Sequence, residues 1–380
     1  MDIETRILLE SIKRVEPVTT FLLNRYFPTN ASTDIFRTKN ILVEYKRGHK
    51  TVAPFISPRS NGVILERAGH YMREYTPPMI GIRRITTLDS LTERGFGEAL
   101  YSDLTPQERE KTLLVQDMAD MQDSLTRKKE VMASEVLFTN RLTVKEYGED
   151  GQPVGEGWDV RFYDGDVNPA IYTPVKDWST DLESGEQIFA DLAAMIKMLS
   201  RRGLPATEVI IASDVADVLV NNEYIFEKLD NRRFELGTLA PQELPDGVTR
   251  LGRFLIPTVG RSLDFYCYDE EYYDEETGTF KPYIPKGHII LLAPGCGHTV
   301  YGGISQMEDD HHFHTYAGVN VPRYFSNVRD NMNEIIMRSA PLLLPHQESP
   351  WVVAQVLTQE EEGIKVPIDK PEQGESDGNE

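Results

Sequence analysis

The chain has 380 residues, 40% of them hydrophobic, and its 61 acidic residues exceed its 40 Lys and Arg enough to give a formal net charge of −21. At roughly 150 residues per domain, this length predicts about two domains, with chain left over for arms or loops. Such an acidic chain is a poor candidate for a protein that grips nucleic-acid phosphates, since each phosphate contact normally needs a Lys or Arg.

The sequence also lacks the marks of a membrane protein or a disulfide-bonded protein. No apolar run approaches the ~20 residues that span a bilayer, and the charged N-terminal segment predicts no signal peptide. The two cysteines, Cys267 and Cys296, are too few for a disulfide framework, so we expect an intracellular, reducing origin. Cys267 lies in a strand-like run and is predicted to be a buried packing residue.

The first 37 residues are predicted to form an arm. Apolar residues on one face of 2–15 predict a short amphipathic helix, which Pro17 ends. The apolar and aromatic stretch 21–28 follows with no domain around it, so we expect it to lie either on its own domain or on a neighbour.

Residues 38–87 are predicted to be strands and loops, with no helix of useful length. Fifty residues of extended chain are more than a compact domain usually tolerates, and such excursions are generally functional. Arg and Lys recur on its polar positions, including 46–50, Arg59, Arg67, Arg73, Arg83 and Arg84. Nucleic-acid binding is one interpretation of this local positive charge, but contact with acidic neighbouring subunits fits better.

The clearest helix signal covers residues 105–137. Thr105 and Glu108 form a capping box, with Pro106 at the first helical position. The helix would be ~50 Å long. It carries charged residues around a single apolar stripe: Leu114, Met118, Met121, Leu125, Met132 and Val136. We expect it to pack along this line on a sheet or a partner; a coiled-coil seam is the alternative.

The remainder of the chain alternates strands and helices. A hairpin is predicted at 140–165, a helix from the capping box at Ser184 to Gly203, a buried strand at 208–212 and a helix capped by Ser213. Further strands are predicted at 253–256, 264–268, 288–292, 298–301, 334–340 and 351–357. The helix–strand–helix block indicates an α/β domain.

Two segments concentrate the negative charge. Residues 269–276 (DEEYYDEE) lie between strand-like runs and predict an acidic hairpin tip. The tail 359–380 carries eight carboxylates and two lysines, a net charge of −6 without one aromatic residue, and is predicted to be disordered and solvated. Neither segment has the spacing of a calcium loop.

One cluster has the residue types of a metal site. Glu308, Asp309, Asp310, His311, His312 and His314 lie within seven consecutive residues, and carboxylates and imidazoles are ligands for zinc and iron. No second ligand cluster has recognisable spacing, and only the fold could bring Cys296 and His298 close. A polar strand or loop with titratable histidines is therefore the preferred interpretation, and a metal-dependent enzyme is the alternative.

No other motif indicates catalysis. The glycines of PGCGHTVYGG match neither a dinucleotide fingerprint nor a phosphate-binding loop, and no GxSxG elbow is present. We therefore expect no enzyme activity, no catalytic residue, no cofactor and no metal. The arm, the extended segment and the long helix with one apolar line are instead features that other copies of the chain would cover.

Four stretches carry a resemblance to a known family. They are SPRSNGVILERAG with REYTPP (57–78), EVIIASDVADVLV with FEKLDNRRFEL (208–236), FYCYDEEYYDEETGTFKPYIPKGHIILL (265–292) and MRSAPLLLPHQESPWVVAQV (337–356). In these stretches the chain resembles the major capsid proteins of lambda-type tailed phages, the major capsid protein E family with the Hong Kong 97-type shell fold. The resemblance extends over about 21–357 and concerns turn and packing residues, so it indicates a fold rather than a site.

The resemblance implies an α+β fold with a defined order of parts. It implies an N-terminal arm (1–37) reaching across neighbours, an extended β-hairpin loop (38–87) over the adjacent subunit, and a peripheral domain (88–170) with the spine helix. An α/β axial domain (171–325) would follow, then a return to the peripheral domain (326–358) and the acidic tail (359–380). The tail lies beyond the usual end of the family, and its role stays open.

The resemblance also implies partners. The chain would self-assemble into homo-hexamers and homo-pentamers of an icosahedral virion shell, built in the host cytoplasm with no membrane. A separate scaffolding protein, a portal and a decoration protein are expected, and reinforcement would be non-covalent because nothing marks a Lys–Asn crosslink. An acidic lining would hold packaged DNA without gripping it. An encapsulin-like nanocompartment is the alternative in the same structural class.

Overall fold

The computed structural model describes residues 18–46, 70–87, 105–148, 151–179, 182–225, 237–307, 311–327 and 331–358, with isolated positions 52, 53, 55, 91 and 329. The helix expected over 2–15 and the acidic tail lie outside these residues. No helix in the described part of the chain is long and apolar enough to cross a membrane.

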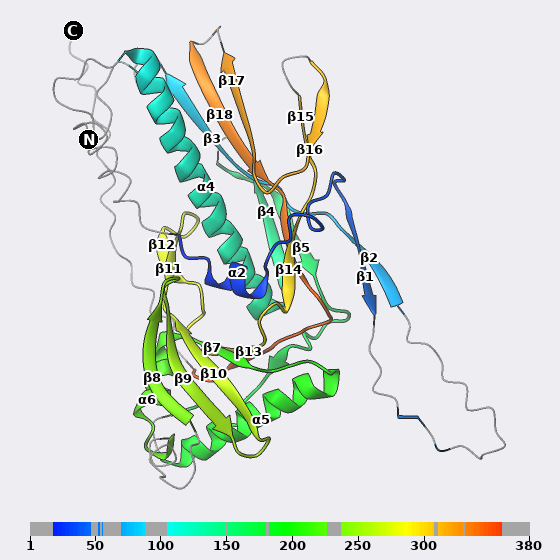
Figure 1. Ribbon diagram of the computed structural model, residues 1–380, viewed down its shortest axis with the longest axis vertical. Coiled ribbons are helices and arrows are strands. Elements are labelled where there is room, and N and C mark those ends of the chain that lie inside the picture. Colours follow the sequence, from blue (N-terminus) through cyan, green and yellow to red (C-terminus); the bar gives the residue numbers. More distant parts are fainter. Residues whose placement is uncertain are drawn as a thin grey trace.

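A seven-stranded sheet forms the lower half of the elongated molecule (Figure 1). In sheet order its strands are β6 (Ile171–Tyr172), β20 (Val352–Gln355), β13 (His288–Leu292), β7 (Glu208–Ile211), β10 (Arg261–Tyr268), β9 (Val248–Ile256) and β8 (Gly237–Leu244). The β7–β10 and β20–β6 pairs are parallel, and the other pairs are antiparallel. Every residue of β7 is buried, as expected of a strand covered on both faces.

Two helices pack along this sheet, α5 (Leu182–Arg202) and α6 (Ser213–Asn221). The predicted apolar stripe of α5 is buried: Ile188, Leu192, Met195, Ile196 and Leu199. Gly203 follows α5 with a φ of 83°, the left-handed conformation that glycine adopts without strain, and its N–H bonds the carbonyl of Ser200.

A buried carboxylate joins α5 to the strand beside it. Asp191, on α5, accepts hydrogen bonds from the indole N–H of Trp178 at 3.0 Å and from the hydroxyl of Tyr172 at 2.8 Å. Gln187, one turn earlier, donates a third bond at 2.8 Å. Burial and the bond to Asp191 raise the pKa of Tyr172 to about 12. This network attaches residues 172–178 to the helix.

The upper half consists of the long helix α4 (Pro106–Thr139) and a three-stranded sheet, β17 (Val321–Asn327), β18 (Met332–Ser339) and β3 (Ile80–Thr87), in that order. The predicted capping box is confirmed: the Thr105 hydroxyl accepts the Glu108 N–H, and the Glu108 carboxylate accepts the Thr105 N–H. Asn140, with a φ of 55°, ends the helix in the left-handed conformation.

The apolar stripe of α4 packs in two places. Its first half forms a separate small core with the sheet, which contains Leu114, Met118, Met121, Leu125, Ile80, Ile82, Ile335 and Met337. Its second half, including Met132 and Val136, joins the main core, which also contains residues of the seven-stranded sheet. The helix therefore packs on sheets of its own chain and connects the two halves of the molecule.

Hairpins and one isolated pair complete the fold. The structure shows β1 (Ile41–Lys46) with β2 (His70–Tyr75), β4 (Arg141–Tyr147) with β5 (Pro153–Arg161), β11 (Glu271–Asp274) with β12 (Thr279–Pro282), β15 (Ile304–Met307) with β16 (Phe313–Tyr316), and β14 (Gly297–Tyr301) with β19 (Pro341–Pro345). All five pairs are antiparallel. The hairpin expected near 140–165 is confirmed by β4–β5. The acidic segment 269–276 is not the tip between the strands at 264–268 and 288–292, because β7 lies between β10 and β13; part of the segment instead forms β11, which pairs with β12 in a separate hairpin.

Two helix starts differ from the sequence expectation. α5 begins at Leu182, so Ser184 lies inside the helix instead of capping it. α6 has Ala212 as its N-cap and no side-chain cap bond, because Ser213 is already helical and the Asp214 carboxylate bonds the N–H of Val215.

The final strands also differ from the expected order of parts. β20 was expected to return toward α4, but it lies inside the seven-stranded sheet between β6 and β13. The boundary expected between 325 and 326 falls within β17, which pairs with β18 over seven residues. The sequence of a short apolar strand does not indicate which sheet it joins, because its pairing partners are far away in the chain.

Candidate assembly surfaces

The N-terminal segment is held by a buried carboxylate of the long helix. The backbone N–H groups of Leu22 and Leu23, in the short helix α2 (Phe21–Tyr26), donate to Glu130 at 2.7 and 2.9 Å. The Tyr268 hydroxyl approaches the same carboxylate at 3.2 Å. Glu130 is fully buried, and desolvation raises its pKa to about 7 even though these bonds favour the charged form. The first turn of α2 is thereby fixed to α4.

A second carboxylate fixes the other end of α2 to the seven-stranded sheet. Arg25 forms an ion pair with Glu208, the first residue of β7, and the Tyr26 hydroxyl donates to the same carboxylate at 2.8 Å. The Arg25 guanidinium also lies 5.0 Å from the centre of the Tyr266 ring. Of the two expectations for stretch 21–28, packing on its own domain is the correct one, so this part of the arm does not reach across neighbours.

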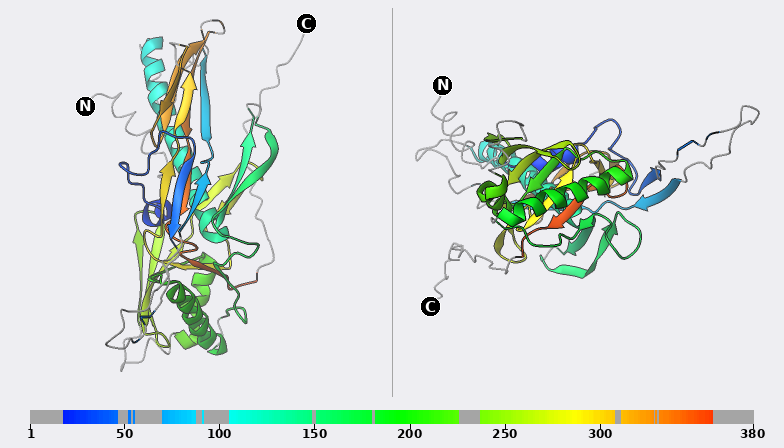
Figure 2. Two further views of the ribbon diagram at one scale, coloured as in Figure 1. Left: turned by 90° about the vertical axis from the view of Figure 1, so that its right-hand side faces the viewer. Right: turned by 90° about the horizontal axis from the view of Figure 1, so that it is seen from below.

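The β1–β2 hairpin has two different faces. Ile41, Tyr45 and Tyr75 are buried on the inner face, where the Tyr75 ring lies 5.7 Å from Phe162 and Arg73 pairs with Asp164. The register places Leu42, Glu44, Lys46, His70, Met72 and Glu74 on the outer face, and Leu42, Glu44, Met72 and Glu74 are exposed. Figures 1 and 2 show this hairpin projecting from the side of the body. The tip expected from the sequence lies mostly outside the described residues.

Other apolar side chains are exposed around the molecule. Val52 and Phe55, between β1 and β2, are 86% and 107% exposed. Further examples are on β4–β5 and the following chain (Tyr147, Val154, Trp158, Val167, Ile171 and Val175) and on β15–β16 (Met307, Phe313 and Tyr316). Exposed apolar groups that lie together on one hairpin, as on β4–β5 and β15–β16, are typical of surfaces that partners cover.

The three-stranded sheet also has two faces. On the face toward α4, Arg84 pairs with Asp117 at 2.5 Å and Asp120 at 3.2 Å, and the Tyr324 hydroxyl donates to Glu110. The register places three arginines on the opposite face, Arg83, Arg323 and Arg338. This outer face also contains Ile85, which is 46% exposed.

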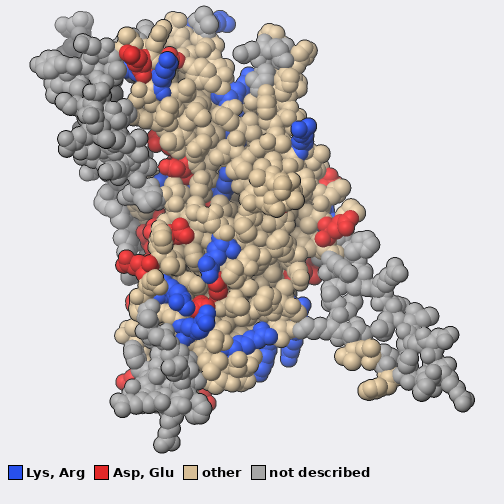
Figure 3. Space-filling view, in the orientation of Figure 1, with Lys and Arg blue, Asp and Glu red and all other residues tan. Residues whose placement is uncertain are grey.

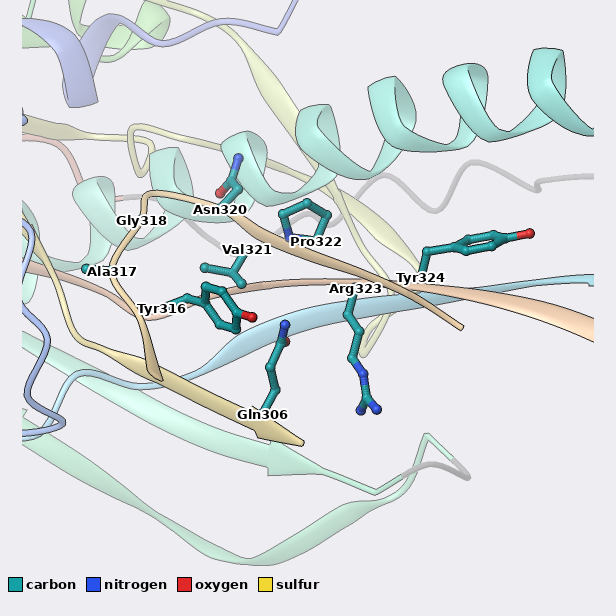
Figure 4. Close-up of a pocket in the computed structure, with 9 residues that line it drawn as sticks. All are labelled: Gln306, Tyr316, Ala317, Gly318, Asn320, Val321, Pro322, Arg323 and Tyr324. Atoms are coloured by element: carbon teal, nitrogen blue, oxygen red, sulfur yellow. The ribbon is translucent and has the colours of Figure 1, made fainter. Parts of the chain in front are cut away.

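A hollow of about 460 Å³ borders the outer face of the sheet. In Figure 4, Gln306, Tyr316 and Arg323 extend into it, whereas Asn320 and Tyr324 extend toward α4. On the α4 side, Asn320 accepts a bond from Lys129, whose burial lowers its pKa to about 8. The wall of the hollow combines polar side chains with Val321, Pro322 and the ring of Tyr316.

Acidic side chains of the β11–β12 hairpin form ion pairs with lysines of the same chain. Lys281 of β12 pairs with Asp274 of β11, and Lys145 of β4 pairs with Glu276, each at 2.5 Å. These lysines lower the pKa values of both carboxyl groups. Figure 3 shows positive and negative side chains scattered over the visible face of the described residues, without a large patch of one sign.

The histidine cluster is only partly described. Asp309 and Asp310 lie outside the described residues; His311 precedes β16 with a φ of 61°, and His314 is an exposed residue of β16 paired with Gln306. Among the described residues, no three His, Cys, Asp or Glu side chains are placed to hold a metal ion.

The additional candidate ligands point elsewhere. The Cys296 thiol lies 3.9 Å from the carbonyl of Tyr26, and burial raises its pKa. His298 stacks on His346 with ring centres 4.6 Å apart and Nδ1 atoms 3.2 Å apart. Burial lowers the pKa of both rings. Cys267, predicted to be buried, is only half-buried against the main core, and this burial raises its pKa to about 11.

Sequence reasoning missed the buried carboxylates that organise this structure. Glu130 was assigned to the charged faces of the long helix, and Glu208 and Asp191 drew no attention. A signal was available for Glu130, because it precedes the buried pair Met132 and Ala133 on a helix that has to enter a core. Apart from Gln187, which is four residues from Asp191, the described partners of these carboxylates are 13 or more residues away in the chain, which no local pattern indicates.

Comparison with known proteins identifies the family. Residues 4–356 match the family model described as phage major capsid protein E. The chain is 23% identical over 336 residues to the P21 prophage-derived major head protein of Escherichia coli O6:H1 (strain CFT073), covering 84% of this chain and 90% of the relative. The major capsid protein of Enterobacteria phage P21 matches with the same identity and coverage.

Solved structures show the same fold. The crystal structure of the putative capsid protein of an E. coli CFT073 prophage matches with a TM-score of 0.58 and 16% identity, covering 94% of this chain and all of that one. The SrpI encapsulin of Synechococcus elongatus PCC 7942 matches with a TM-score of only 0.42 and 12% identity, too weak to support the nanocompartment alternative. The fold is thus the expected α+β, Hong Kong 97-type capsid fold. With the family model matched along nearly its whole length, the chain belongs to the phage major capsid protein E family.

Proposed function

We propose that this chain, the major capsid protein of a tailed phage, self-assembles into homo-hexamers and homo-pentamers of an icosahedral head shell around double-stranded DNA. Each contact would be heterologous, joining different surface patches of two neighbouring copies. Such contacts form closed rings when the rotation from one copy to the next adds up to a full turn. The observation that carries the proposal is the β1–β2 hairpin, which stands out from the body with Leu42, Met72, Val52 and Phe55 exposed. Exposed apolar side chains on a projecting hairpin are typical of a surface that another protein surface covers.

The order of parts proposed for the shell follows the two halves of the fold. The half with α4 and the three-stranded sheet would be the peripheral domain, and the half with the seven-stranded sheet would be the axial domain at five-fold and six-fold centres. Residues 38–79 would form the extended loop over the adjacent subunit. β3 is left out of the loop because it is paired with β18 along its whole length.

The proposed role is structural and not catalytic. The shell would be part of the virion, assembled in the host cytoplasm with a separate scaffolding protein, a portal and a decoration protein. The net charge of −21 supports a container that holds DNA without tight binding, since acidic side chains repel phosphates.

Removal of the loop tip tests the proposal. Replacing 47–69 by Asn-Gly joins Lys46 to His70, which are already partners in the β1–β2 register, through a two-residue turn suited to a hairpin. We expect a folded protein with an unchanged circular dichroism spectrum that forms no closed shells in electron micrographs. Normal shells from this variant would refute the role given to the loop.

A further inference from the structure

Two histidines that are distant in the chain meet at one end of the β14–β19 pair. His298 of β14 is the register partner of Leu344, and His346 follows the last residue of β19. The backbone N–H of His346 donates to the carbonyl of Cys296 at 3.0 Å, which keeps the two segments together one step beyond the strands. We call His298 and His346 the histidine pair.

The rings of the histidine pair approach each other through the same nitrogen. Their planes are 17° apart, their centres 4.6 Å apart and their Nδ1 atoms 3.2 Å apart. One hydrogen between the Nδ1 atoms satisfies two neutral rings, because one nitrogen then donates and the other accepts. Two nitrogens bound to a tetrahedral zinc ion at ~2.0–2.1 Å are roughly 3.3 Å apart. The separation therefore suits a metal ion between the rings as well as a hydrogen.

The surroundings keep the rings in the form that binds metals. Burial lowers the pKa of both rings, so both stay neutral at neutral pH, and the neutral imidazole is the metal ligand. The carboxylate of Asp34 acts in the opposite direction on both pKa values, so its negative charge favours a cation at this position.

Asp34 supplies this charge without being a ligand. Its carboxylate accepts the backbone N–H of Asn30 at 2.7 Å and the hydroxyl of Thr33 at 2.9 Å, which hold it within its own turn. In the part of the chain that the structure describes, no group of three His, Cys, Asp or Glu side chains is placed to hold a metal ion. Because His346 is exposed, water can fill the remaining positions around an ion held by two rings.

We propose that the histidine pair binds a divalent transition-metal ion such as Zn²⁺ through its two Nδ1 atoms. Imidazole nitrogens suit zinc, copper and nickel, whereas calcium and magnesium take oxygen ligands. The ion takes the place of the hydrogen between the rings. That hydrogen is lost from Nδ1 and one is gained at Nε2 of the same ring, so both rings stay neutral and no net proton is released.

A metal ion at the histidine pair connects β14 to the chain that enters the seven-stranded sheet. His346 begins the segment between β19 and β20, and β20 belongs to that sheet. β14 also holds the N-terminal segment, since the Thr299 hydroxyl donates to the carbonyl of Phe27 and the Tyr301 N–H to the carbonyl of Asp34, each at 2.8 Å. The bound ion therefore stabilises the junction of three segments that are distant in the chain.

The histidines at 311–314 are the competing site for a metal ion. His311, His312 and His314 are exposed and lie close together in the chain, which is why they drew attention in the sequence. His346, by contrast, is 48 residues after His298, so the sequence did not indicate the pair, and we expected no metal. The experiment therefore has to separate the two groups of histidines.

Calorimetric titration with ZnCl₂ tests the proposal. The full chain is purified without a polyhistidine tag, freed of metal with a chelator and titrated at a pH of about 7.5, where histidine is neutral. We expect His346→Ala to lower the affinity for zinc by at least about tenfold, since even changes outside the ligands cost about that much. His312→Ala with His314→Ala is the matched control and should keep a site of unchanged affinity.

Urea unfolding gives a second readout. An ion that binds only the folded chain lowers the unfolding equilibrium constant in proportion to its concentration. At ten times the measured dissociation constant, zinc should lower this constant by about tenfold in the wild type and in the double control. In His346→Ala zinc should leave it unchanged. His298→Gln, which keeps a polar side chain, should behave like His346→Ala and replaces it if that variant does not fold.

Three results would overturn the proposal. The first is zinc affinity that is equal in the wild type and in folded variants of the histidine pair. The second is loss of zinc binding in the His312→Ala, His314→Ala double variant alone, which would assign the ion to the 311–314 segment. The third is a wild-type chain that binds no zinc, which would leave the pair as a hydrogen-bonded contact only. Shell formation enters none of these measurements, so the proposed function is tested separately.

Discussion

At the scale of single residues, buried carboxylates position the N-terminal segment. Glu130 accepts two adjacent backbone N–H groups of α2, and Glu208 accepts Arg25 and Tyr26 from the same helix. One carboxylate belongs to α4 and the other to β7, so six residues of α2 connect the two halves of the molecule. Removing either carboxylate would leave buried donors without partners.

The carboxyl of Glu130 should make stability depend on pH. Its pKa is about 7 in the folded state and near 4.5 when unfolded, so the folded protein binds more protons between these values. Folding stability therefore falls as pH rises from about 5 to 7, by up to about 3 kcal/mol. In Glu130→Gln this contribution to the pH dependence of urea unfolding should disappear. Glu186→Gln, an exposed carboxylate on α5, serves as the control with the wild-type slope.

Gly297 is required by close packing against the arm. A Cβ atom at this position would lie 2.5 Å from the Phe27 ring and 2.6 Å from the carbonyl oxygen of Leu344. Gly297→Ala should therefore lower the free energy of unfolding by about 1–3 kcal/mol, measured by urea titration. In Gly318→Ala the new atom meets nothing closer than 3.6 Å, so this control should stay near wild type. Equal free energies of unfolding for the two variants would show that Phe27 can move away from the new methyl group without loss of stability.

At the scale of elements, helix signals in the sequence were reliable where they were local. The capping box at Thr105 and the stripe of α4 specify a helix from residues within one or two turns of each other. Ser184 failed as a cap because the helix was extended upstream, where Leu182 is already helical. Ser213 failed because Asp214 provides the bond to the first turn.

Strand placement was less predictable for a physical reason. β18 and β20 both lie near the C-terminus, yet β18 pairs with β3 and β20 pairs with β13. The choice depends on partners more than 60 residues away. From the sequence, the assembly surfaces could be predicted only as an exposed loop with basic residues. Which side chains share one face of the sheet depends on the register between strands, and the sequence alone does not give that register.

The cap of α4 should stabilise the end of the helix without being essential to it. Thr105→Ala removes the hydroxyl that accepts the Glu108 N–H and should cost about 1 kcal/mol. Hydrogen exchange should be faster in the first turn of α4 and unchanged near Val136, which is buried in the main core. Faster exchange along the whole helix would contradict the view that α4 is held by the two cores.

At the scale of the whole molecule, most described segments bury their apolar side chains within the chain, and the β1–β2 hairpin is the main exception. α2, which the sequence suggested could be part of an arm across neighbours, is buried on α4 and β7. The β1–β2 hairpin instead keeps the apolar side chains of Leu42 and Met72 exposed to solvent. The residues beyond those needed for two domains therefore have two roles. α2 connects the two halves of the molecule, and the β1–β2 hairpin provides a surface for contact with another molecule.

The measurement that tests the central claim most directly is electron microscopy of the purified chain, expressed alone and together with the gene products encoded beside it. The account predicts hollow closed shells, or rings of five and six subunits, in at least one of these preparations. A chain that stays a monomer or dimer in every preparation would contradict it.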